Sequence, residues 1–294
     1  MKKQFKTKLK RLRTLLVKNF FGFGVQDLSR ALRKLGLQEG DVVLCHVAFN
    51  KFQGFRGRAD DVVGCLQEVV GKTGTLLMPT MPFSVSALDY VKQTEVTDLE
   101  VSPSAMGLVT EIFRRMPGVV RSKHPTHPVA AYGPLAEEMV RDHSSAGTPC
   151  GVNSPFNRLL DLQGKIVFLG TGIEAMTFYH SVEELLEPQM PVSPFTADWF
   201  ELKTRDAAGD ISITWTRLYN PILSRHRDLN ILLPELQKSG SWRAGQVGLV
   251  PVAAVKASEV LNTCLQMAAS GRFCYRTQWN CRGPDLHQTW PPSS

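Results

Sequence analysis

The sequence lacks the paired cysteines that mark zinc knuckles and redox motifs. Its six cysteines are scattered, and none forms a C-x-x-C pair: Cys45, Cys65, Cys150, Cys264, Cys274 and Cys281. A chain of 294 residues, of which 43% are hydrophobic, can bury a core without disulfides. We therefore expect a reducing, cytoplasmic location in which the cysteines are mostly small core residues.

Long apolar runs are also missing. No stretch of 18 uncharged apolar residues occurs, so we predict no membrane-spanning helix. Lys18 interrupts the apolar run near the N-terminus and no small-residue cleavage site follows, so we expect no secretory signal. Without repeats or low-complexity runs, we expect a basic segment over residues 1–24, a single domain over 25–280 and a loose tail over 281–294.

The first 18 residues contain eight basic side chains and no acid. Removing those eight from the 34 Lys and Arg of the chain leaves 26 against 27 Asp and Glu, so the remainder is nearly neutral. Apolar residues recur there at helical spacing, which predicts a basic amphipathic helix: Phe5, Leu9, Leu12, Leu16 and Phe20. A solvated or docking helix is favoured over weak membrane-surface contact, and we expect no nucleic-acid partner.

Beyond this segment, predicted helices and strands alternate. Short apolar runs predict strands over residues 41–46, 75–78, 129–132 and 165–170. Helical patterns cover residues 27–35, 60–70, 104–115 with Ser104 as N-cap, 154–162 and 253–269. The alternation predicts a three-layer α/β/α fold with a mixed, mostly parallel sheet. Residues 199–203 and 211–215 flank RDAAGD and predict an antiparallel C-terminal hairpin added to this sheet.

The stretch KIVFLGTGIEAMTFYHSVEELL, from Lys165 to Leu186, contains GTGIEA, which fits the dinucleotide pattern G-x-G-x-x-A. That motif also needs an acid about 20 residues later, where this chain has Met190. We favour the alternative that Thr171 and Glu174 form a capping box that opens a helix.

His180 and Glu183 lie three residues apart on this predicted helix and therefore share one face. A carboxylate bonded to an imidazole fixes its tautomer and leaves the other nitrogen free to accept a proton. The spacing thus predicts a general base, with a solvated surface pair as the alternative.

A second cluster, RSKHPTHPVAAYG, places two histidines in a proline-rich turn before a strand. His124, His127, His180 and Glu183 could together bind zinc or iron in a metal-dependent hydrolase, although no Asp or Cys nearby completes the set. Cys150 could instead be an acyl-accepting nucleophile with His180 as its base, but packing is the usual role of a cysteine.

Several segments, in order and spacing, resemble the aminoglycoside 3-N-acetyltransferase family, which has the antibiotic N-acetyltransferase fold. The matching stretches within residues 25–190 are GDVVLCHVAF, GKTGTLLMPT, SPSAMGLVTEIFRRMPGVVRSKHPTHPVAAYGPLAEEM, TPCGVNSPFNRLLDLQGKIVFLGTG and MTFYHSVEE. RHRDLNILLPELQKSG and GQVGLVPVAAVKASEVL are similar to the family's C-terminal helices. The R/Q-x-x-G-x-G/A turn of the unrelated GNAT acetyltransferases is absent.

The resemblance implies direct transfer of an acetyl group from acetyl-CoA to an amine of an aminoglycoside or related amino sugar, without a metal. It implies His180 as the catalytic base, Glu183 as its neighbour and His124 at the rim of the same cleft. The implied contacts of the pantetheine and phosphate path are His46, Thr80, Ser104, Met106 and Gly107.

The chain also departs from the family. HVAF stands at residues 46–49 where the family usually has His-Ser-Ser-Leu, and Pro128 stands where serine is common. The acidic cluster expected near the site, which a polycationic acceptor would need, comprises Glu183, Glu184 and Glu187. The sequence thus leaves open whether the acceptor is an antibiotic or a biosynthetic amine, whether the chain is a homodimer, and whether it is an inactive membrane-associated binding protein of the same fold.

Overall fold

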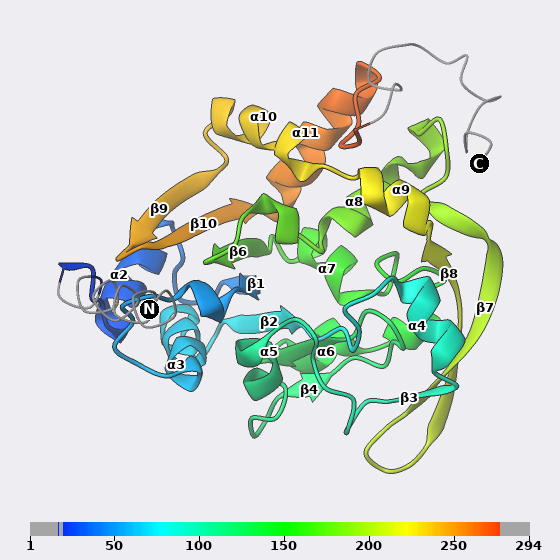
Figure 1. Ribbon diagram of the computed structural model, residues 1–294, viewed down its shortest axis with the longest axis horizontal. Helices are drawn as coiled ribbons and strands as arrows, with labels where there is room; N and C mark the ends of the chain where they lie inside the picture. Colours follow the sequence, from blue (N-terminus) through cyan, green and yellow to red (C-terminus); the bar gives the residue numbers. More distant parts are fainter. Residues whose placement is uncertain (1–16, 18–19, 277–294) are drawn as a thin grey trace, which may run out of the picture.

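A computed structural model describes Val17 and residues 20–276. It contains a seven-stranded sheet with helices on both faces (Figure 1). In spatial order the strands are β4 (Val120–Arg121), β5 (Val129–Tyr132), β2 (Thr75–Pro79), β1 (Val42–Val47), β6 (Lys165–Leu169), β10 (Val250–Lys256) and β9 (Arg243–Val247). β1 pairs in parallel with both β2 and β6, and the outer pairs are antiparallel, so β4, β2, β1, β6 and β9 share one direction. The predicted α/β class and the mixed, mostly parallel sheet are confirmed.

The central strands are buried on both faces, as their continuous apolar runs predict. In β1 all six residues are buried, and alternate side chains enter opposite cores. One core includes helices α6 (Ala136–Val140), α7 (Pro155–Asp161), α8 (Tyr179–Leu186), α10 (Leu233–Lys238) and α11 (Ala257–Ala269). The other includes α2 (Val25–Lys34), α3 (Ala59–Val70) and α5 (Leu108–Phe113). The predicted three layers are therefore present.

The predicted hairpin forms, but its expected addition to the main sheet was wrong. β7 (Phe195–Arg205) and β8 (Ile211–Tyr219) pair with each other, and β7 also pairs with β3 (Val96–Asp98) in a separate three-stranded sheet. Helix α4 (Ala87–Gln93) contacts β8, and α9 (Pro221–His226) follows it. In the second half of β7 buried and exposed side chains occur side by side, as in Leu202 and Glu201, so this sheet buries one face only.

Two predicted helix starts were wrong because the backbone turns later than the side-chain pattern indicates. Ser104 precedes α5 by four residues, and the N-cap is Gly107, whose φ of 125° is rarely adopted by residues with a side chain. Residues 253–256, predicted as helix, belong to β10 and pair with β6. Short valine-rich runs such as VPVAAVK fit a strand as well as a buried helix, so periodicity alone misassigned them.

The helix that carries His180 also begins later than predicted. Glu174 accepts hydrogen bonds from the Gly172 N–H at 2.9 Å and the Thr171 hydroxyl at 3.2 Å, but these close a short 3₁₀ turn, Ile173–Ala175. Met176 is extended, with ψ of 91°, and α8 starts only at Tyr179. The glycine-rich turn after β6 is therefore closed by its own carboxylate.

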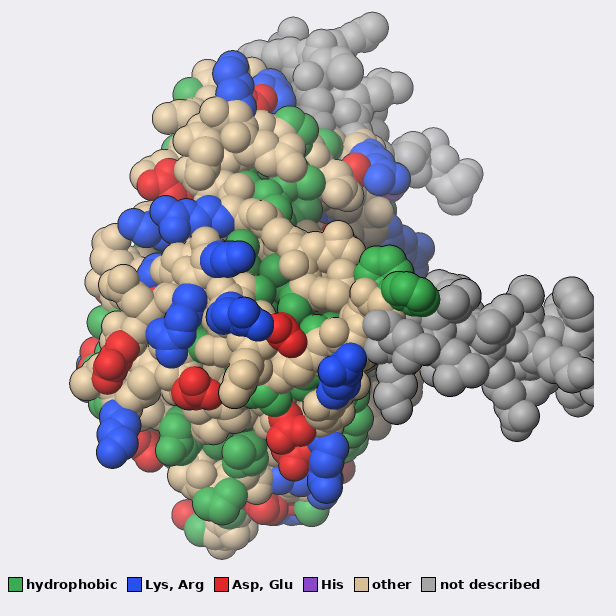
Figure 2. Space-filling view, turned by 90° about the vertical axis from the view of Figure 1, so that its left-hand side faces the viewer, with side chains coloured by type: hydrophobic (Ala, Val, Ile, Leu, Met, Phe, Trp, Pro, Cys, Tyr) green, Lys and Arg blue, Asp and Glu red, His purple; other side chains and the backbone are tan. Residues whose placement is uncertain are grey.

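The surface of the described residues carries both signs of charge. Lys and Arg side chains occur beside Asp and Glu across the face shown in Figure 2, in keeping with the near-neutral body of the chain. Among residues 20–276 and Val17, no helix is both long and apolar enough to cross a membrane. The predicted basic helix and the predicted tail over 281–294 lie outside the described residues, apart from Val17 and residues 20–24 at the end of the basic segment.

Candidate active site

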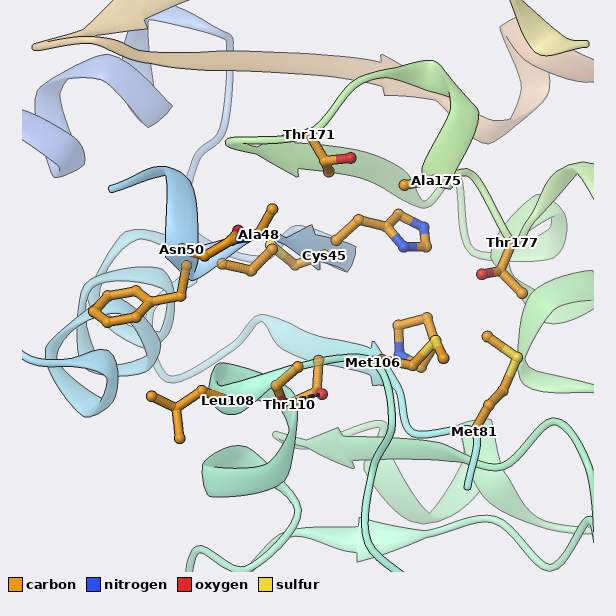
Figure 3. Close-up of a pocket in the computed structure, with 15 residues that line it drawn as sticks. Cys45, Ala48, Asn50, Met81, Met106, Leu108, Thr110, Thr171, Ala175 and Thr177 are labelled. Carbon is orange, nitrogen blue, oxygen red and sulfur yellow. Dashed lines mark hydrogen bonds between the residues drawn. The ribbon is translucent and has the colours of Figure 1, made fainter. Parts of the chain in front are cut away.

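A cavity of about 590 Å³ opens at the carboxyl ends of β2, β1 and β6 (Figure 3). Crevices outside the ends of parallel strands are the usual ligand sites of open α/β sheets. Met81, Met106 and Thr177 lie around the same opening, although they come from three different loops. None of the fifteen described residues that line the cavity is charged. The cavity thus suits an uncharged, largely apolar group.

The predicted cofactor contacts divide into two groups. His46, Met106 and Gly107 line the cavity, whereas Thr80 and Ser104 do not. The side chains of these last two are used inside the protein.

Thr80 is buried behind the wall of the cavity. Its hydroxyl donates to the Pro128 carbonyl at 3.1 Å and accepts from Arg121 Nε at 3.0 Å. Ser104 has a similar role, because its hydroxyl bonds Thr110 Oγ1 at 2.7 Å, and Thr110 lines the cavity. Both residues therefore support the loops that form the wall.

The predicted pair on α8 forms. His180 Nδ1 lies 2.8 Å from Glu183 Oε2. Glu183 is fully buried and also receives Arg227, whose Nε is 2.8 Å from Oε1 and whose Nη2 is 2.8 Å from Oε2, together with the Tyr275 hydroxyl. The His180 side chain is 17% exposed. The alternative of a solvated surface pair is therefore wrong, and the ring is still accessible.

These surroundings fix the charges of the pair. Burial lowers the pKa of His180, and the Arg227 charge lowers it further against the opposing effect of Glu183. Burial alone would raise the pKa of Glu183, but Arg227 and the hydrogen bond with His180 bring it down to about 2. A charged Glu183 selects a proton on His180 Nδ1, so Nε2 of the neutral ring can accept one.

An aromatic side chain holds the imidazole in place. The Tyr219 ring stacks on His180 with centroids 4.0 Å apart, and the Tyr219 hydroxyl donates to Glu184. Glu184 also accepts from the Cys150 N–H at 3.0 Å and from the Thr148 hydroxyl. Adjacent acids of α8 thus act on one ring, because Glu183 bonds its Nδ1 and Glu184 anchors the tyrosine stacked on its face.

The sequence profile of the family described as aminoglycoside 3-N-acetyltransferase matches residues 44–269, which is 226 of the 294 residues. The chain belongs to this family. Its relatives in the acetyltransferase family include aminoglycoside N(3)-acetyltransferase VII of Streptomyces paromomycinus, 31% identical over 173 residues and 54% of this chain. Aminoglycoside N(3)-acetyltransferase IX of Micromonospora chalcea is 31% identical over 175 residues, also 54% of this chain. The chain spans 60% and 61% of the lengths of these two relatives.

A longer alignment joins this acetyltransferase-family chain to aminoglycoside N(3)-acetyltransferase VIII of Streptomyces fradiae, at 26% identity over 258 residues, 80% of this chain and 87% of the relative. Solved structures with the same fold include the aminoglycoside acetyltransferase AAC(3)-Xa, with a TM-score of 0.72 and 24% identity. The match covers 87% of this chain and 95% of that structure's chain. AAC-IIIb in a binary complex with CoASH has a TM-score of 0.68 and 22% identity. The match covers 82% of this chain and 94% of that structure's chain.

His124 does not lie at the rim of the cleft in this family member, so that expectation was wrong. It is fully buried, and its Nδ1 accepts the backbone N–H groups of Thr126 at 3.3 Å and His127 at 3.2 Å. The proline-rich turn closes around this nitrogen, and the ring stacks on His143 with centroids 4.6 Å apart. His127 is the histidine of this turn that contacts His180, ring edge to face at 5.8 Å.

The structure does not support the two alternative chemistries, a metal site and a cysteine nucleophile. Among the described residues, no three or more His, Cys, Asp and Glu side chains are arranged to hold a metal, so the proposed ligand set does not form. Both Glu183 oxygens are instead bonded by neighbouring side chains. Cys150 is fully buried, and burial raises the pKa of its thiol well above the usual value, which disfavours a nucleophilic thiolate.

Sequence reasoning missed three side chains of the site. Arg227 and Tyr275 lie 44 and 92 residues after Glu183, and Tyr219 joins from β8. The only available signal was the basic segment RHRDLN, which lies within one of the stretches similar to the family. Asp198 and Glu201, two acids of β7, are exposed.

Proposed function

We propose that the chain is an acetyl-CoA-dependent N-acetyltransferase acting on an amine of an aminoglycoside or related amino sugar. The observation that carries this proposal is a neutral, accessible His180 that follows the lining of an uncharged cavity at the strand ends, although His180 is not itself a lining residue. The His180 backbone N–H donates to the carbonyl of Thr177 at 3.0 Å, and Thr177 lines the cavity. Base and cavity are thus joined within one short turn.

The cavity suits the acyl and pantetheine part of the donor. Its lining is mostly apolar and contains no charged side chain, which disfavours the diphosphate and is compatible with a thioester. The complex of AAC-IIIb with CoASH, a protein of the same fold, supports the choice of donor.

The residues account for each proton. The neutral amine attacks the thioester carbonyl carbon, and His180 Nε2 takes the proton that the nitrogen loses as the C–N bond forms. The C–S bond then breaks, and the departing thiolate recovers the proton from the imidazolium. The charged Glu183 stabilises that imidazolium, and general-base help of this kind contributes about 10²–10⁴-fold to the rate. This direct transfer needs no covalent enzyme intermediate.

The names of the relatives support an aminoglycoside acceptor, but the acids on and next to α8 are not arranged to bind a highly charged one. Glu183 is paired with Arg227, Glu184 is turned inward, and the adjoining Glu187 pairs with Arg217 at 3.0 Å. Because a polycation is best bound by acids that face it, we extend the proposed acceptors to amino sugars that carry fewer charges. A biosynthetic role and a resistance role both fit this class.

We also propose a cytoplasmic location. The described cysteines, Cys45, Cys65, Cys150, Cys264 and Cys274, are free and buried. Unpaired thiols are usual in reducing compartments.

The decisive test is thiol release from acetyl-CoA with a panel of amines. His180→Gln should lower kcat by about 10²-fold or more while keeping the wild-type melting temperature and its rise on adding acetyl-CoA. His226→Gln, at a position outside the cavity lining, is the matched control. Full turnover by His180→Gln would disprove the base, and a melting temperature that acetyl-CoA leaves unchanged in the wild type would disprove the donor.

A further inference from the structure

His46, at the end of β1, differs from the other buried histidines of the described chain. It is 8% exposed, stacks on Phe168 with centroids 5.5 Å apart, and lines the cavity. His124, His127 and His143 each have one ring nitrogen within hydrogen-bond distance of a partner, although Nε2 of His124 is also sealed and unpartnered. Within residues 20–276, His46 makes no such bond, and its Nε2 is sealed from solvent.

A sealed nitrogen without a partner costs about 1–3 kcal/mol, and such groups in native proteins often mark a functional site. The packing against Phe168 explains the ring plane of His46 but leaves this polar atom unexplained. The ring would therefore be better replaced by an apolar one if stability alone decided the residue at this position.

The burial of one nitrogen also indicates where the proton is. Burial lowers the pKa of His46 to about 3, so the ring is neutral and has one N–H and one lone pair. An orphaned buried N–H is rarer in proteins than an acceptor with a free lone pair, which assigns the lone pair to the sealed Nε2. The N–H is then on Nδ1, the nitrogen of His46 that is not sealed and that is left to face the cavity.

We propose that His46 is a further catalytic residue, whose Nδ1–H donates to the carbonyl oxygen of the acyl thioester. This inference rests on the proposed acetyltransferase function. When the amine attacks, the carbonyl π electrons move to the oxygen, and the N–H stabilises the negative charge there. The electrons return as the C–S bond breaks, and His46 keeps its proton throughout.

The strand register places this donor next to the strand that leads to the base. His46 on β1 pairs with Phe168 on β6, and β6 continues through the glycine turn to Thr177 and His180. The donor therefore lines the cavity from the end of β1, and the base lies on α8, which follows the adjacent strand β6. Thr110, another polar residue of the lining, is already occupied, because its hydroxyl donates to the Gly107 carbonyl at 2.9 Å.

Three substitutions separate the N–H from the shape of the ring. Asn places an amide N–H near the position of Nδ1, Gln places one near Nε2, and Phe keeps only the flat ring. His46→Phe should lower kcat with acetyl-CoA by about 10²–10³-fold without lowering the melting temperature, since it removes an unpartnered polar atom. His46→Asn should stay within about tenfold of the wild type, and His46→Gln should resemble the Phe variant.

Infrared difference spectra of acetyl-CoA labelled with ¹³C at the carbonyl give a direct readout. The bound carbonyl band should lie at lower wavenumber in the wild type and His46→Asn than in His46→Phe. Equal carbonyl bands and equal kcat in all variants would overturn the role of His46 but leave the proposed acetyltransferase function standing. A wild type that neither binds acetyl-CoA nor releases thiol would overturn the proposed function and this inference with it. If His46→Phe fails to fold, the Asn and Gln variants decide between the same outcomes.

Discussion

At the scale of single residues, the candidate base depends on a charge that is distant in sequence. Arg227 is 16% exposed and contacts both oxygens of a fully buried Glu183. Removing one partner of such a pair leaves the other charge buried and uncompensated, which costs about 3–5 kcal/mol. Arg227 also lowers the pKa of His180, so it acts on both stability and reactivity.

Arg227→Met should therefore lower the free energy of unfolding by about 3–5 kcal/mol. It should also raise the pKa of His180, because a cation that opposes protonation of the ring is removed. As the proposed base, His180 acts in its neutral form, so the acid limb of the kcat/KM profile should move to higher pH. Urea unfolding and pH–rate profiles measure the two effects.

Arg272→Met is the matched control, because Arg272 pairs with Glu235 at 3.0 Å but both side chains are partly exposed. Its loss should cost less than about 1 kcal/mol and leave the pH–rate profile in place. An unshifted acid limb in Arg227→Met would contradict the electrostatic link between the arginine and the base.

The same residues show how far the sequence could lead. Spacing of three along a helix was enough to predict that His180 and Glu183 meet, and the structure confirms the contact. The partners of Glu183 from residues 227 and 275 could not be found in this way, because only the folded chain brings them together. The burial of His124 was equally hidden, since it results from a turn closing around its ring.

At the scale of elements, strands were predicted more accurately than helix starts. The predicted bounds of β1, β2 and β5 agree with the structure to within one residue, because their side chains are buried on both faces and read as continuous apolar runs. The predicted starts near Ser104 and Thr171 failed where backbone dihedrals, and not side-chain periodicity, decide where the chain turns.

Gly170 is one such position, and it joins β6 to the site. Its φ is 72°, and a Cβ there would lie 2.8 Å from the carbonyl oxygen of Ala48, which lines the cavity. Gly170→Ala should therefore combine strain of about 1–2 kcal/mol with overpacking of about 1–3 kcal/mol. It should also reduce the rise in melting temperature on adding acetyl-CoA, because the wall formed by Ala48 must move.

Gly209→Ala isolates the backbone term. Gly209 has a φ of 88°, but its Cβ would meet nothing within 4 Å. Thermal unfolding of both variants, with and without acetyl-CoA, measures the difference. Gly209→Ala should lose less stability than Gly170→Ala, and acetyl-CoA should still raise its melting temperature as in the wild type. Equal effects in both variants would show that the contact with Ala48 has no influence on the cavity.

At the scale of the whole molecule, buried imidazoles link stability to pH. Burial lowers the pKa of five histidines below the usual value: His46, His124, His127, His143 and His180. Below about pH 6.5, the unfolded chain binds protons at these positions that the native chain does not bind. The contribution of these histidines to the free energy of unfolding therefore rises with pH in this range, and it decreases as the solution becomes more acidic.

Glu184 changes the stability with pH in the opposite direction. Burial raises its pKa from 4.5 to about 7, although three hydrogen bonds oppose the shift. Between these two values the native carboxyl holds a proton that the unfolded chain releases, so its contribution to stability falls as pH rises. The five histidines together outweigh this single group, so at about pH 5.5 unfolding should take up protons on balance.

Glu184→Gln removes the opposing group, so its free energy of unfolding should depend more steeply on pH, by about one proton or about 1.4 kcal/mol per pH unit near pH 5.5. Urea unfolding between pH 5 and 7 measures the slope, with the exposed Glu201→Gln as the matched control. Equal slopes in the wild type and Glu184→Gln would mean that Glu184 is ionised in the native protein. The tyrosine that packs on His180 would then be anchored by a carboxylate, and Glu184→Gln would weaken that anchor at neutral pH.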